Sequence, residues 1–205
     1  MVITIDGPAA SGKGTLAYRL GKHLGIPHLD TGLLYRAVGD RLLADGRALD
    51  DVTAAVAAAQ AIKIDSIARD SLLGSEVGEA ASRVAAMPEV RAALLSIQRT
   101  FAQNPGGAVL DGRDTGTVVC PNADVKLFVV ATAEARAARR HKELTERGEK
   151  TTYEEVLADI RRRDERDTAR AVAPLKPAPD AVLLDTTALD IEAAFQEALR
   201  IVRRV

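Results

Sequence analysis

The stretch GPAASGKGT, Gly7 to Thr15, directly follows the apolar run VITI in this 205-residue chain. It nearly matches the phosphate-loop pattern G-x-x-x-x-G-K-[ST], in which backbone N–H groups, a helix N-terminus and a lysine hold phosphate oxygens. Gly14 stands where the pattern has Ser or Thr, and Thr15 supplies the hydroxyl one residue later. The strand–glycine turn–helix context around Lys13 favours phosphate binding over a turn that merely joins strand to helix.

Short apolar runs alternate with helical patterns along the rest of the chain. Runs of this kind without an apolar–polar alternation are typical of parallel strands buried on both faces. The sequence therefore predicts one α/β domain over residues 1–205, with a five-stranded parallel sheet and helices on both faces. We expect strands at 2–5, 27–30, 108–111, 125–131 and 181–185, helices at about 12–24, 33–43, 133–147, 152–169 and 190–203, and a mostly helical middle up to about 103.

Composition bears on several classes of protein. A net charge of -1 argues against broad binding to nucleic acid, and no apolar run approaches the roughly 20 residues of a membrane helix. The N-terminal segment predicts a strand rather than a signal peptide. Cys120 has no second cysteine with which to form an intrachain disulfide, and we interpret it as a small buried residue. We therefore expect a cytoplasmic protein with neither a membrane nor a nucleic acid as partner.

The cluster DTGLLYR, residues 30–36, follows the second predicted strand. Thr31 is a candidate cap for the next helix. Arg36 lies about a turn and a half into that helix, where a guanidinium can hold a phosphate through two nitrogens. Taken alone, Arg36 is more typical of a solvated surface residue, so its interpretation depends on the neighbouring clusters.

The cluster LDGRDTGTVV, residues 110–119, discriminates most sharply between functions. Asp111 ends the third predicted strand, beside the phosphate loop, where an acidic residue can organise a hydrated Mg²⁺. Arg113 and Asp114 follow in a loop at the carboxyl edge of the sheet, the edge at which open α/β sheets bind ligands. A polar turn built by two glycines is the alternative interpretation.

A charged run, RRRDERDTARAVAPL, covers residues 161–175. On a helix, Arg163, Asp167 and Arg170 occupy positions i, i+4 and i+7 and therefore share one face. A solvated face held by pairs such as Arg163–Asp167 is the alternative. We interpret the face as ligand-binding because the predicted helix lies across from the phosphate loop.

These motifs together resemble the bacterial cytidylate kinases over essentially the whole chain. GPAASGKGT, with its Thr after an extra glycine, is similar to the loop of nucleoside monophosphate kinases. LDTGLLYR, ASRVAAMPEVR and the terminal LLDTT add to the likeness, and DGRDTGTVV and RDERDTARAVAPL distinguish it from adenylate and guanylate kinases. The resemblance implies transfer of a phosphoryl group from ATP to CMP or dCMP with Mg²⁺, in a fold with a helical NMP-binding segment at about 31–103, a core at about 1–30 and 104–205, and a short lid.

The resemblance also implies a role for each matching residue. Arg36, Arg113 and Arg170 hold the phosphate of CMP, Ser82, Arg91 and Asp114 read cytosine, Arg163 and Asp167 approach the sugar, and Thr31 completes the CMP-binding set. Lys13, Arg113, Arg163 and Arg170 form the catalytic set, and Asp111 and Thr15 hold the metal mainly through water. The ATP-binding set is Gly7, Pro8, Ala9, Ala10, Ser11, Gly12, Lys13, Gly14 and Thr15, with Arg136 and Arg140 as contacts that a solvated helix face would also explain.

Three expectations concern the moving and catalytic parts. The charged stretch at about 143–155 predicts a lid between two helices, closing on ATP. No general base is needed, because the CMP phosphate is already mostly dianionic at neutral pH, and we interpret His23, His28 and His141 as structural or exposed. The segment at about 46–79 is shorter than in family members that insert a strand-rich subdomain there.

Two other functions remain open from the residues. One is a kinase for a different small molecule, such as UMP, AMP or shikimate. The other is a nucleotide-binding regulatory module without transfer activity, although a pure ATP switch has no use for the second group of arginines. We expect a monomer.

Overall fold

The computed structural model describes residues 1–204 and contains two compact units. The first unit comprises Met1–Leu29 and the chain from Thr100 onward, and it is built on a five-stranded sheet. The second unit, Asp30–Arg99, is helical. The strands are β1 (Val2–Asp6), β2 (His28–Asp30), β3 (Ala108–Gly112), β4 (Val125–Val130) and β5 (Val182–Asp185), each within about a residue of its predicted range.

The sheet has the strand order β2-β3-β1-β4-β5. Strand β1 pairs in parallel with β3 on one side and with β4 on the other, and β4 pairs in parallel with β5. In this register Asp6, the last residue of β1, lies opposite Gly112 and Phe128. The predicted five-stranded parallel α/β fold is confirmed, and the carboxyl ends of β1, β3 and β4 meet at one edge.

Helices account for most of the remaining chain. The first unit holds α1 (Lys13–Leu24), a π-helical turn η3 (Thr115–Val119), α6 (Ala133–Glu146), α7 (Tyr153–Ala169) and α8 (Ile191–Val202). The second unit holds α2 (Thr31–Ala44), α3 (Val52–Gln60), the short turns η1 (Ile64–Ser66) and η2 (Arg69–Leu72), and α4 (Ser75–Val84), while α5 (Pro88–Ala102) runs from the second unit into the first. In the described residues 1–204 no helix combines the length and apolar character needed to cross a membrane.

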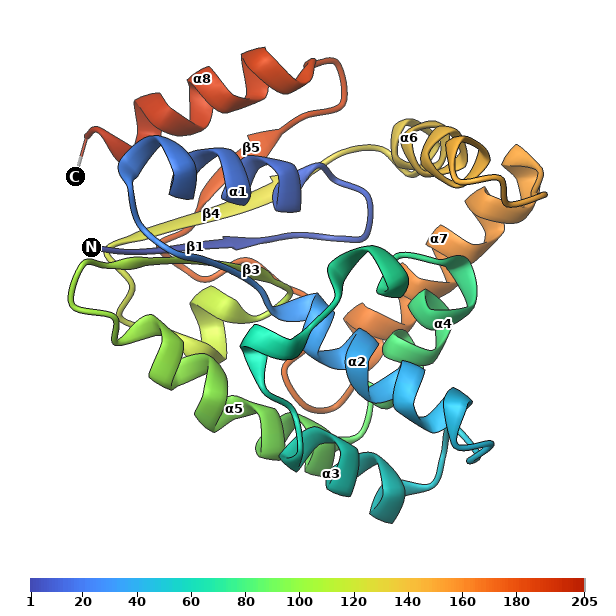
Figure 1. The fold of residues 1–205 in the computed structure, drawn as a ribbon. Helices are drawn as coiled ribbons and strands as arrows, with labels where there is room; N and C mark the ends of the chain where they lie inside the picture. Colours follow the sequence, from blue (N-terminus) through green and yellow to red (C-terminus); the bar gives the residue numbers. More distant parts are fainter. Residues whose placement is uncertain (205) are drawn as a thin grey trace. The chain divides into compact units, whose positions relative to one another are not determined.

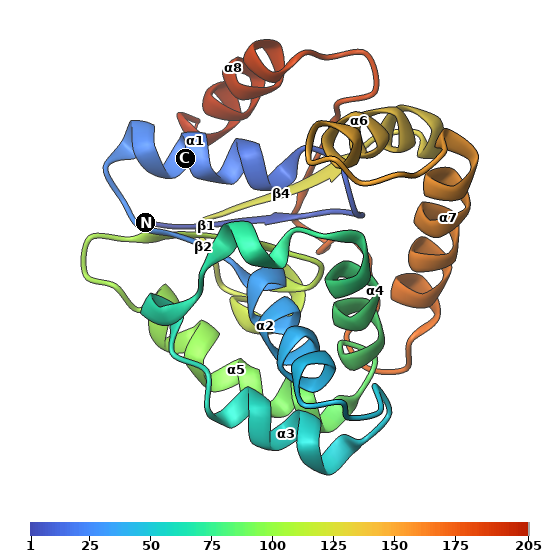
Figure 2. The same cartoon turned by 45° about the vertical axis from the view of Figure 1, so that its right-hand side comes forward.

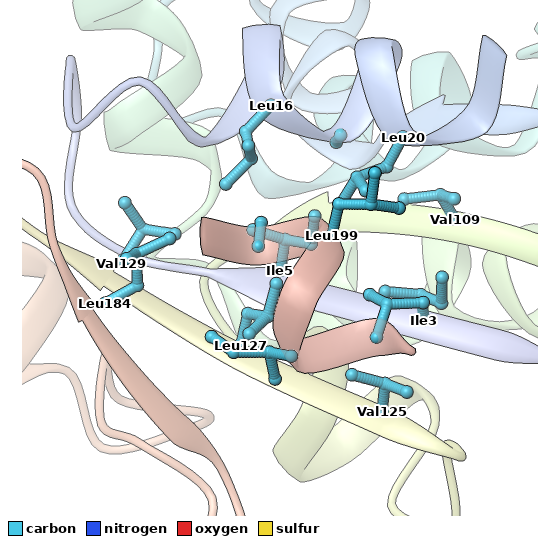
Figure 3. Close-up of a cluster of buried hydrophobic side chains, with 14 of the residues drawn as sticks. Ile3, Ile5, Leu16, Leu20, Val109, Val125, Leu127, Val129, Leu184 and Leu199 are labelled. Atoms are coloured by element: carbon cyan, nitrogen blue, oxygen red, sulfur yellow. The ribbon is translucent and has the colours of Figure 1, made fainter. Parts of the chain in front are cut away.

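One face of the sheet carries the main apolar core of the first unit (Figures 1 and 3). Helices α1 and α8 lie side by side on this face. Because side chains alternate along a strand, every second residue of β1 and β4 points into this core. The buried cluster consists of Ile3, Ile5, Leu16, Ala17, Leu20, Val109, Val125, Leu127, Val129, Leu184, Phe195, Ala198, Leu199, Ile201 and Val202.

The opposite face of β1 and β4 is polar and is covered by η3. Thr4, Asp6 and Lys126 alternate with the core residues, and all three are buried. A Cβ on Gly116 would stand 2.9 Å from Thr4 Oγ1 and 3.4 Å from Asp6 Oδ2, so the turn approaches the strand closely. A residue larger than glycine at position 116 would therefore collide with Thr4 of the strand.

Helices α6 and α7 form a pair in the first unit (Figure 2). Ala137 and Leu144 of α6 are buried with Val156 and Ile160 of α7. The run TTYEE starts α7 with a capping box, in which Thr152 and Glu155 satisfy each other's backbone N–H groups. The expected lid at 143–155 thus contains the end of α6, the connection 147–152 and the start of α7.

In the second unit α2 packs against α4 and α3. The contact with α4 is close, because a Cβ on Gly39 would lie 2.8 Å from Ala80 Cβ. The segment between α3 and α4 contains η1 and η2 and no strand. The prediction of a mostly helical middle is confirmed.

Replacing Leu20 by Ala should lower the free energy of unfolding by about 2–5 kcal/mol, because Leu20 is fully buried between α1 and the sheet and the change leaves a cavity. Lys22→Ala on the exposed side of the same helix is the matched control, and we expect a change within about 0.5 kcal/mol. Urea unfolding of both variants measures the difference. Equal losses for the two variants would contradict the assigned core.

Candidate active site

The phosphate loop connects β1 to α1 in a backbone conformation that its residues allow. A Cβ on Gly7 would stand 2.1 Å from Val129 O, so only glycine fits where the loop leaves the sheet. Gly12 has φ 88°, in the left-handed region, directly before α1 begins. Ala10 also has a positive φ of 58°, a conformation that costs energy for a residue with a Cβ. This local strain is concentrated where the motif predicts phosphate contacts.

Side chains from distant elements hold the loop in place. Thr186, just after β5, donates from Oγ1 to Ser11 O at 2.9 Å, and Arg139 of α6 donates to Thr186 O at 2.5 Å. Lys13 Nζ lies 3.4 Å from Pro8 O, within the loop itself. Sequence reasoning assigned no role to Thr186 or Arg139. The terminal LLDTT run, which contributed to the resemblance, was the available signal for Thr186.

The two arginines proposed from α6 differ in their surroundings. Arg136 is buried: its Nη1 donates to Ala9 O at 3.2 Å, and its guanidinium forms a two-nitrogen pair with Asp164 of α7. Arg140 pairs with Glu143 at 2.8 Å. A solvated helix face is therefore the wrong interpretation for Arg136, which joins α6, α7 and the phosphate loop, and contact of either arginine with ATP stays a prediction.

Asp111 lies beside the phosphate loop at the end of β3. It is buried, and its Oδ2 would stand 3.6 Å from a Cβ on Gly14. His28 of β2 contacts it through a 2.7 Å hydrogen bond between Nε2 and Asp111 Oδ1. His28, which we expected to be structural or exposed, is half-buried and contacts the predicted metal residue. The available signal was the position of His28 in β2, the strand next to β3, which ends near Asp111.

The donor set near Asp111 suits a magnesium ion held largely by water and phosphate. Across residues 1–204 no cluster of three or more His, Cys, Asp or Glu side chains offers a complete metal cage. Mg²⁺ commonly takes one or two protein carboxylates and completes its shell with water and substrate phosphates. A single buried carboxylate, with the Thr15 hydroxyl at the start of α1, fits that pattern.

A cluster of charged side chains lies where the loop after β3 meets the end of α7. Arg113 donates from Nε to Asp167 Oδ2 at 2.9 Å. Arg170 Nη1 stands 3.7 Å from Asp167 Oδ1, and its Nη2 stands 4.0 Å from Asp114 Oδ1. Asp167 and Asp114 are both buried. The structure therefore brings together four of the predicted CMP residues, which are far apart in the sequence, in one network of charge.

The charged helix differs from the prediction at Arg170. Arg163 pairs with Asp159 at 2.8 Å, and Arg113 pairs with Asp167 at 2.9 Å. Arg170 does not lie on the helix face, because α7 ends at Ala169 and Arg170 is its extended C-cap residue. Its side chain is nevertheless held by a hydrogen bond to Ala173 O at 2.6 Å. The approach to Asp167 comes from the turn after the helix, which a helical repeat cannot describe.

The second unit holds four further predicted CMP residues. Thr31 is the buried first residue of α2, and the preceding Asp30 takes the cap position. Arg36 of α2 donates from Nη1 to Leu72 O at 2.6 Å and to Gly74 O at 3.3 Å. Arg36 therefore ties the segment before α4 to α2, so the solvated-surface interpretation is wrong.

Arg91 and Ser82 come from neighbouring helices of the same unit. Arg91 of α5 is buried, donates to Ala85 O at 3.2 Å and stands over the ring of Tyr35, 5.4 Å from its centroid. Ser82 is half-buried on α4. The buried guanidinium on an aromatic face is fixed in place by packing as well as by charge.

Asp6, which sequence reasoning did not single out, is the most strongly perturbed acid in the first unit. The Thr115 N–H and Oγ1–H donate to Asp6 Oδ1, both at 2.8 Å, and the Gly116 N–H donates to Oδ2 at 2.7 Å. Burial raises the pKa of Asp6 to about 6, although these hydrogen bonds oppose the rise and the nearby charge of Asp114 adds to it. Its position directly before the phosphate loop was the available signal.

Comparison with known proteins gives matches over nearly the whole chain. The family model described as cytidylate kinase matches residues 3–204. The chain is 62% identical over 202 residues to a cytidylate kinase of Methylocella silvestris, covering 98% of this chain and 94% of that protein. It is 64% identical over 202 residues to a cytidylate kinase of Xanthobacter autotrophicus, covering 98% and 97%.

Solved structures share the fold at low sequence identity. An uncharacterised protein from Eubacterium ventriosum has a TM-score of 0.57 at 13% identity, covering 100% of this chain and 99% of its own. A gluconokinase from Sinorhizobium meliloti has a TM-score of 0.51 at 16% identity, covering 99% of this chain and 91% of its own. These likenesses support the fold alone.

The perturbed pKa of Asp6 predicts a specific pH dependence of stability. The folded chain holds the Asp6 proton up to pH about 6 and the unfolded chain only up to 3.8, so the folded state binds more protons in this window. The contribution of Asp6 to the free energy of unfolding therefore falls as pH rises through the window and is constant above it. We define the difference as the free energy of unfolding of the parent minus that of Asp6→Asn. Measured by urea unfolding, this difference should fall by about 1–3 kcal/mol from acid to neutral pH. A difference independent of pH would contradict the assignment.

Proposed function

The chain belongs to the cytidylate kinase family, and we propose that it transfers the γ-phosphate of ATP to CMP or dCMP, giving ADP and CDP or dCDP. The observation that carries the proposal is the network of Arg113, Asp114, Asp167 and Arg170 at the carboxyl edge of the sheet that also bears the phosphate loop. A phosphate loop alone accounts for a nucleotide donor. The second set of guanidiniums accounts for an anionic acceptor.

The donor side consists of the loop 7–15, whose backbone N–H groups and Lys13 would contact the phosphates of ATP. The helix α1 begins at Lys13 and directs its positive end toward this loop. Arg136 supports the loop by donating a hydrogen bond to Ala9 O. We propose that Arg136 and Arg140 contact ATP.

The acceptor side uses the arginines. Arg113 and Arg170, with Arg36 of the second unit, would hold the CMP phosphate, and Arg163 and Asp167 would approach the sugar. Guanidiniums suit this role, because two parallel N–H groups match two phosphate oxygens. The carbonyl and carboxylate contacts described above restrict these side chains, so less side-chain freedom remains to be lost when the ligand binds.

Cytosine recognition is assigned to Asp114, Ser82 and Arg91, and Thr31 completes the acceptor set. Cytosine presents an amino donor at N4 and acceptors at N3 and O2. A carboxylate such as Asp114 accepts from the amino group, while Arg91 and Ser82 can donate to the acceptors. Uracil reverses the pattern at positions 3 and 4 and should bind less well.

The chemistry needs charge and alignment more than proton transfer. The attacking group is an oxygen of the CMP phosphate, which has a second pKa near about 6 and is largely dianionic at neutral pH. No general base is required. Lys13, Arg113, Arg163 and Arg170 would offset the repulsion between the two polyanions and stabilise the charge of the transferred group.

Magnesium would be held by Asp111 and Thr15, mainly through water. When bound, it supplies positive charge to the donor phosphates. His28 supports this assignment from the protein side, because its hydrogen bond keeps the Asp111 carboxylate in one orientation.

We further propose that the second unit is the NMP-binding segment, predicted at about 31–103, and that the lid is the stretch 143–155. A connection of six residues, 147–152, between the paired helices α6 and α7 supports the lid. Composition supports action in the cytoplasm without nucleic acid or membrane as partner, because the net charge is -1 and Cys120 is the single cysteine. We also propose that the protein is a monomer.

Turnover on CMP, dCMP, UMP, AMP and shikimate tests the function directly. Preference for CMP or dCMP supports the proposal, whereas preference for AMP or shikimate would replace the base assignment. Tight binding of ATP with no phosphorylated acceptor in any reaction would instead indicate a regulatory module.

Replacing Arg170 by Ala should lower kcat/KM for CMP by about 10²-fold or more, because the guanidinium at the transition state is lost. Arg162→Ala, an exposed arginine on α7 that pairs with Asp159, is the matched control and should change it less than about twofold. Steady-state kinetics and circular dichroism measure activity and folding. Similar kinetics for the two variants would overturn the phosphate assignment of Arg170.

Asp114→Asn should relax the choice of base. The Asn amide can donate to O4 of uracil, which the carboxylate cannot, so the ratio of kcat/KM for CMP to that for UMP should fall about tenfold or more. Thr117→Val, a half-buried position on the same turn, serves as the control and should keep the ratio within about twofold of the parent value. An unchanged ratio in Asp114→Asn would remove Asp114 from base recognition.

A further inference from the structure

Both carboxylate oxygens of Asp6 accept hydrogen bonds from the same segment, the start of η3. Oδ1 accepts the Thr115 N–H and the Thr115 hydroxyl, and Oδ2 accepts the Gly116 N–H. Asp6 is 4% exposed, so these contacts are shielded from water. A buried carboxylate that accepts three short hydrogen bonds holds its partner strongly, because separation would leave the carboxylate and the N–H groups unsatisfied.

The partner segment follows the acceptor residues without a break. Arg113 and Asp114 directly precede Thr115, and Asp114 is the N-cap residue of η3. The two N–H groups bound by Asp6 are among those that the start of a helical turn leaves without an internal acceptor. A side chain of β1 therefore caps the turn whose first residues carry the acceptor contacts.

Close packing against the sheet also confines this turn. A Cβ on Gly116 would stand 2.9 Å from Thr4 Oγ1 and 3.4 Å from Lys126 Cδ, so η3 rests directly on the polar face of β1 and β4. Asp6 is also the residue before Gly7, where the phosphate loop begins. One residue thus lies at the origin of the donor loop and at the anchor of the acceptor loop.

We propose that Asp6 is a positioning residue, which fixes the loop carrying Arg113 and Asp114 relative to the phosphate loop by capping η3. The proposal rests on the proposed function in one respect, because Arg113 and Asp114 are assigned there to CMP. Asp6 itself touches neither nucleotide in this account. Its effect on the reaction passes through the orientation of the acceptor residues, so it should act on CMP far more than on ATP.

Asp6→Asn is the closest change in shape that weakens the cap. Asparagine has one acceptor oxygen, so its amide group faces either the N–H of Thr115 or that of Gly116, donor against donor. We expect KM for CMP to rise about tenfold or more and the preference for CMP over UMP to fall, while KM for ATP changes less than about threefold. Thr115→Val, which removes only the hydroxyl contact, should shift KM for CMP in the same direction by a smaller factor.

Leu20→Ala separates positioning from loss of stability. It removes a core side chain of the same unit and should lower thermal stability without changing KM for CMP by more than about twofold. Equal effects of Asp6→Asn on KM for CMP and for ATP, or a loss of stability with no change in KM for CMP, would overturn the proposal.

Amide hydrogen exchange tests the cap without any reaction. The amides of Thr115 and Gly116 should exchange slowly in the parent and at least about tenfold faster in Asp6→Asn, with the amides of β4 much less affected. Unchanged protection at both amides would refute the cap even if activity fell. Failure of the parent to phosphorylate CMP would refute the proposed function, and the exchange result would still decide the cap.

Discussion

In the first unit, backbone hydrogen bonds join β1 in parallel to β3 on one side and to β4 on the other. This pairing places the carboxyl ends of the three strands at one edge, so the phosphate loop begins next to the point at which the loop with Arg113 and Asp114 leaves β3. The apolar face of the same strands is anchored by α1 and α8, and the polar face receives η3. Both functional loops therefore depend on the register of one central strand.

The proposed acceptor site combines positive groups with buried carboxylates. Arg113 and Arg170 both approach Asp167, and Arg163 pairs with Asp159. Buried guanidiniums need such partners, because a charge without compensation inside a protein costs several kcal/mol. The same carboxylates hold the guanidiniums in defined orientations. If these arginines bind the CMP phosphate as we propose, the phosphate must compete with Asp167 for them.

Patterns of near neighbours predicted most of the fold. The strands and the helices of the first unit lie within about a residue or two of their predicted bounds, because burial on both faces and helical periodicity are properties of consecutive residues. The prediction was wrong at Arg170, which lies beyond the last residue of α7 and reaches Asp167 from a turn. Arg163 has a carboxylate four residues away on either side, at Asp159 and at Asp167, so the sequence alone does not predict its pair with Asp159.

The amino-acid sequence alone predicted the phosphate loop, the parallel α/β class and the arginines and acids of the proposed acceptor motifs, because each is encoded in a short run of residues. Only the tertiary structure revealed the roles of Asp6, His28 and Thr186. Their partners lie 109, 83 and 175 residues away, at Thr115, Asp111 and Ser11. Hydrogen bonds over such separations leave no periodic trace along the chain, since they form only after parallel strands bring their carboxyl ends together.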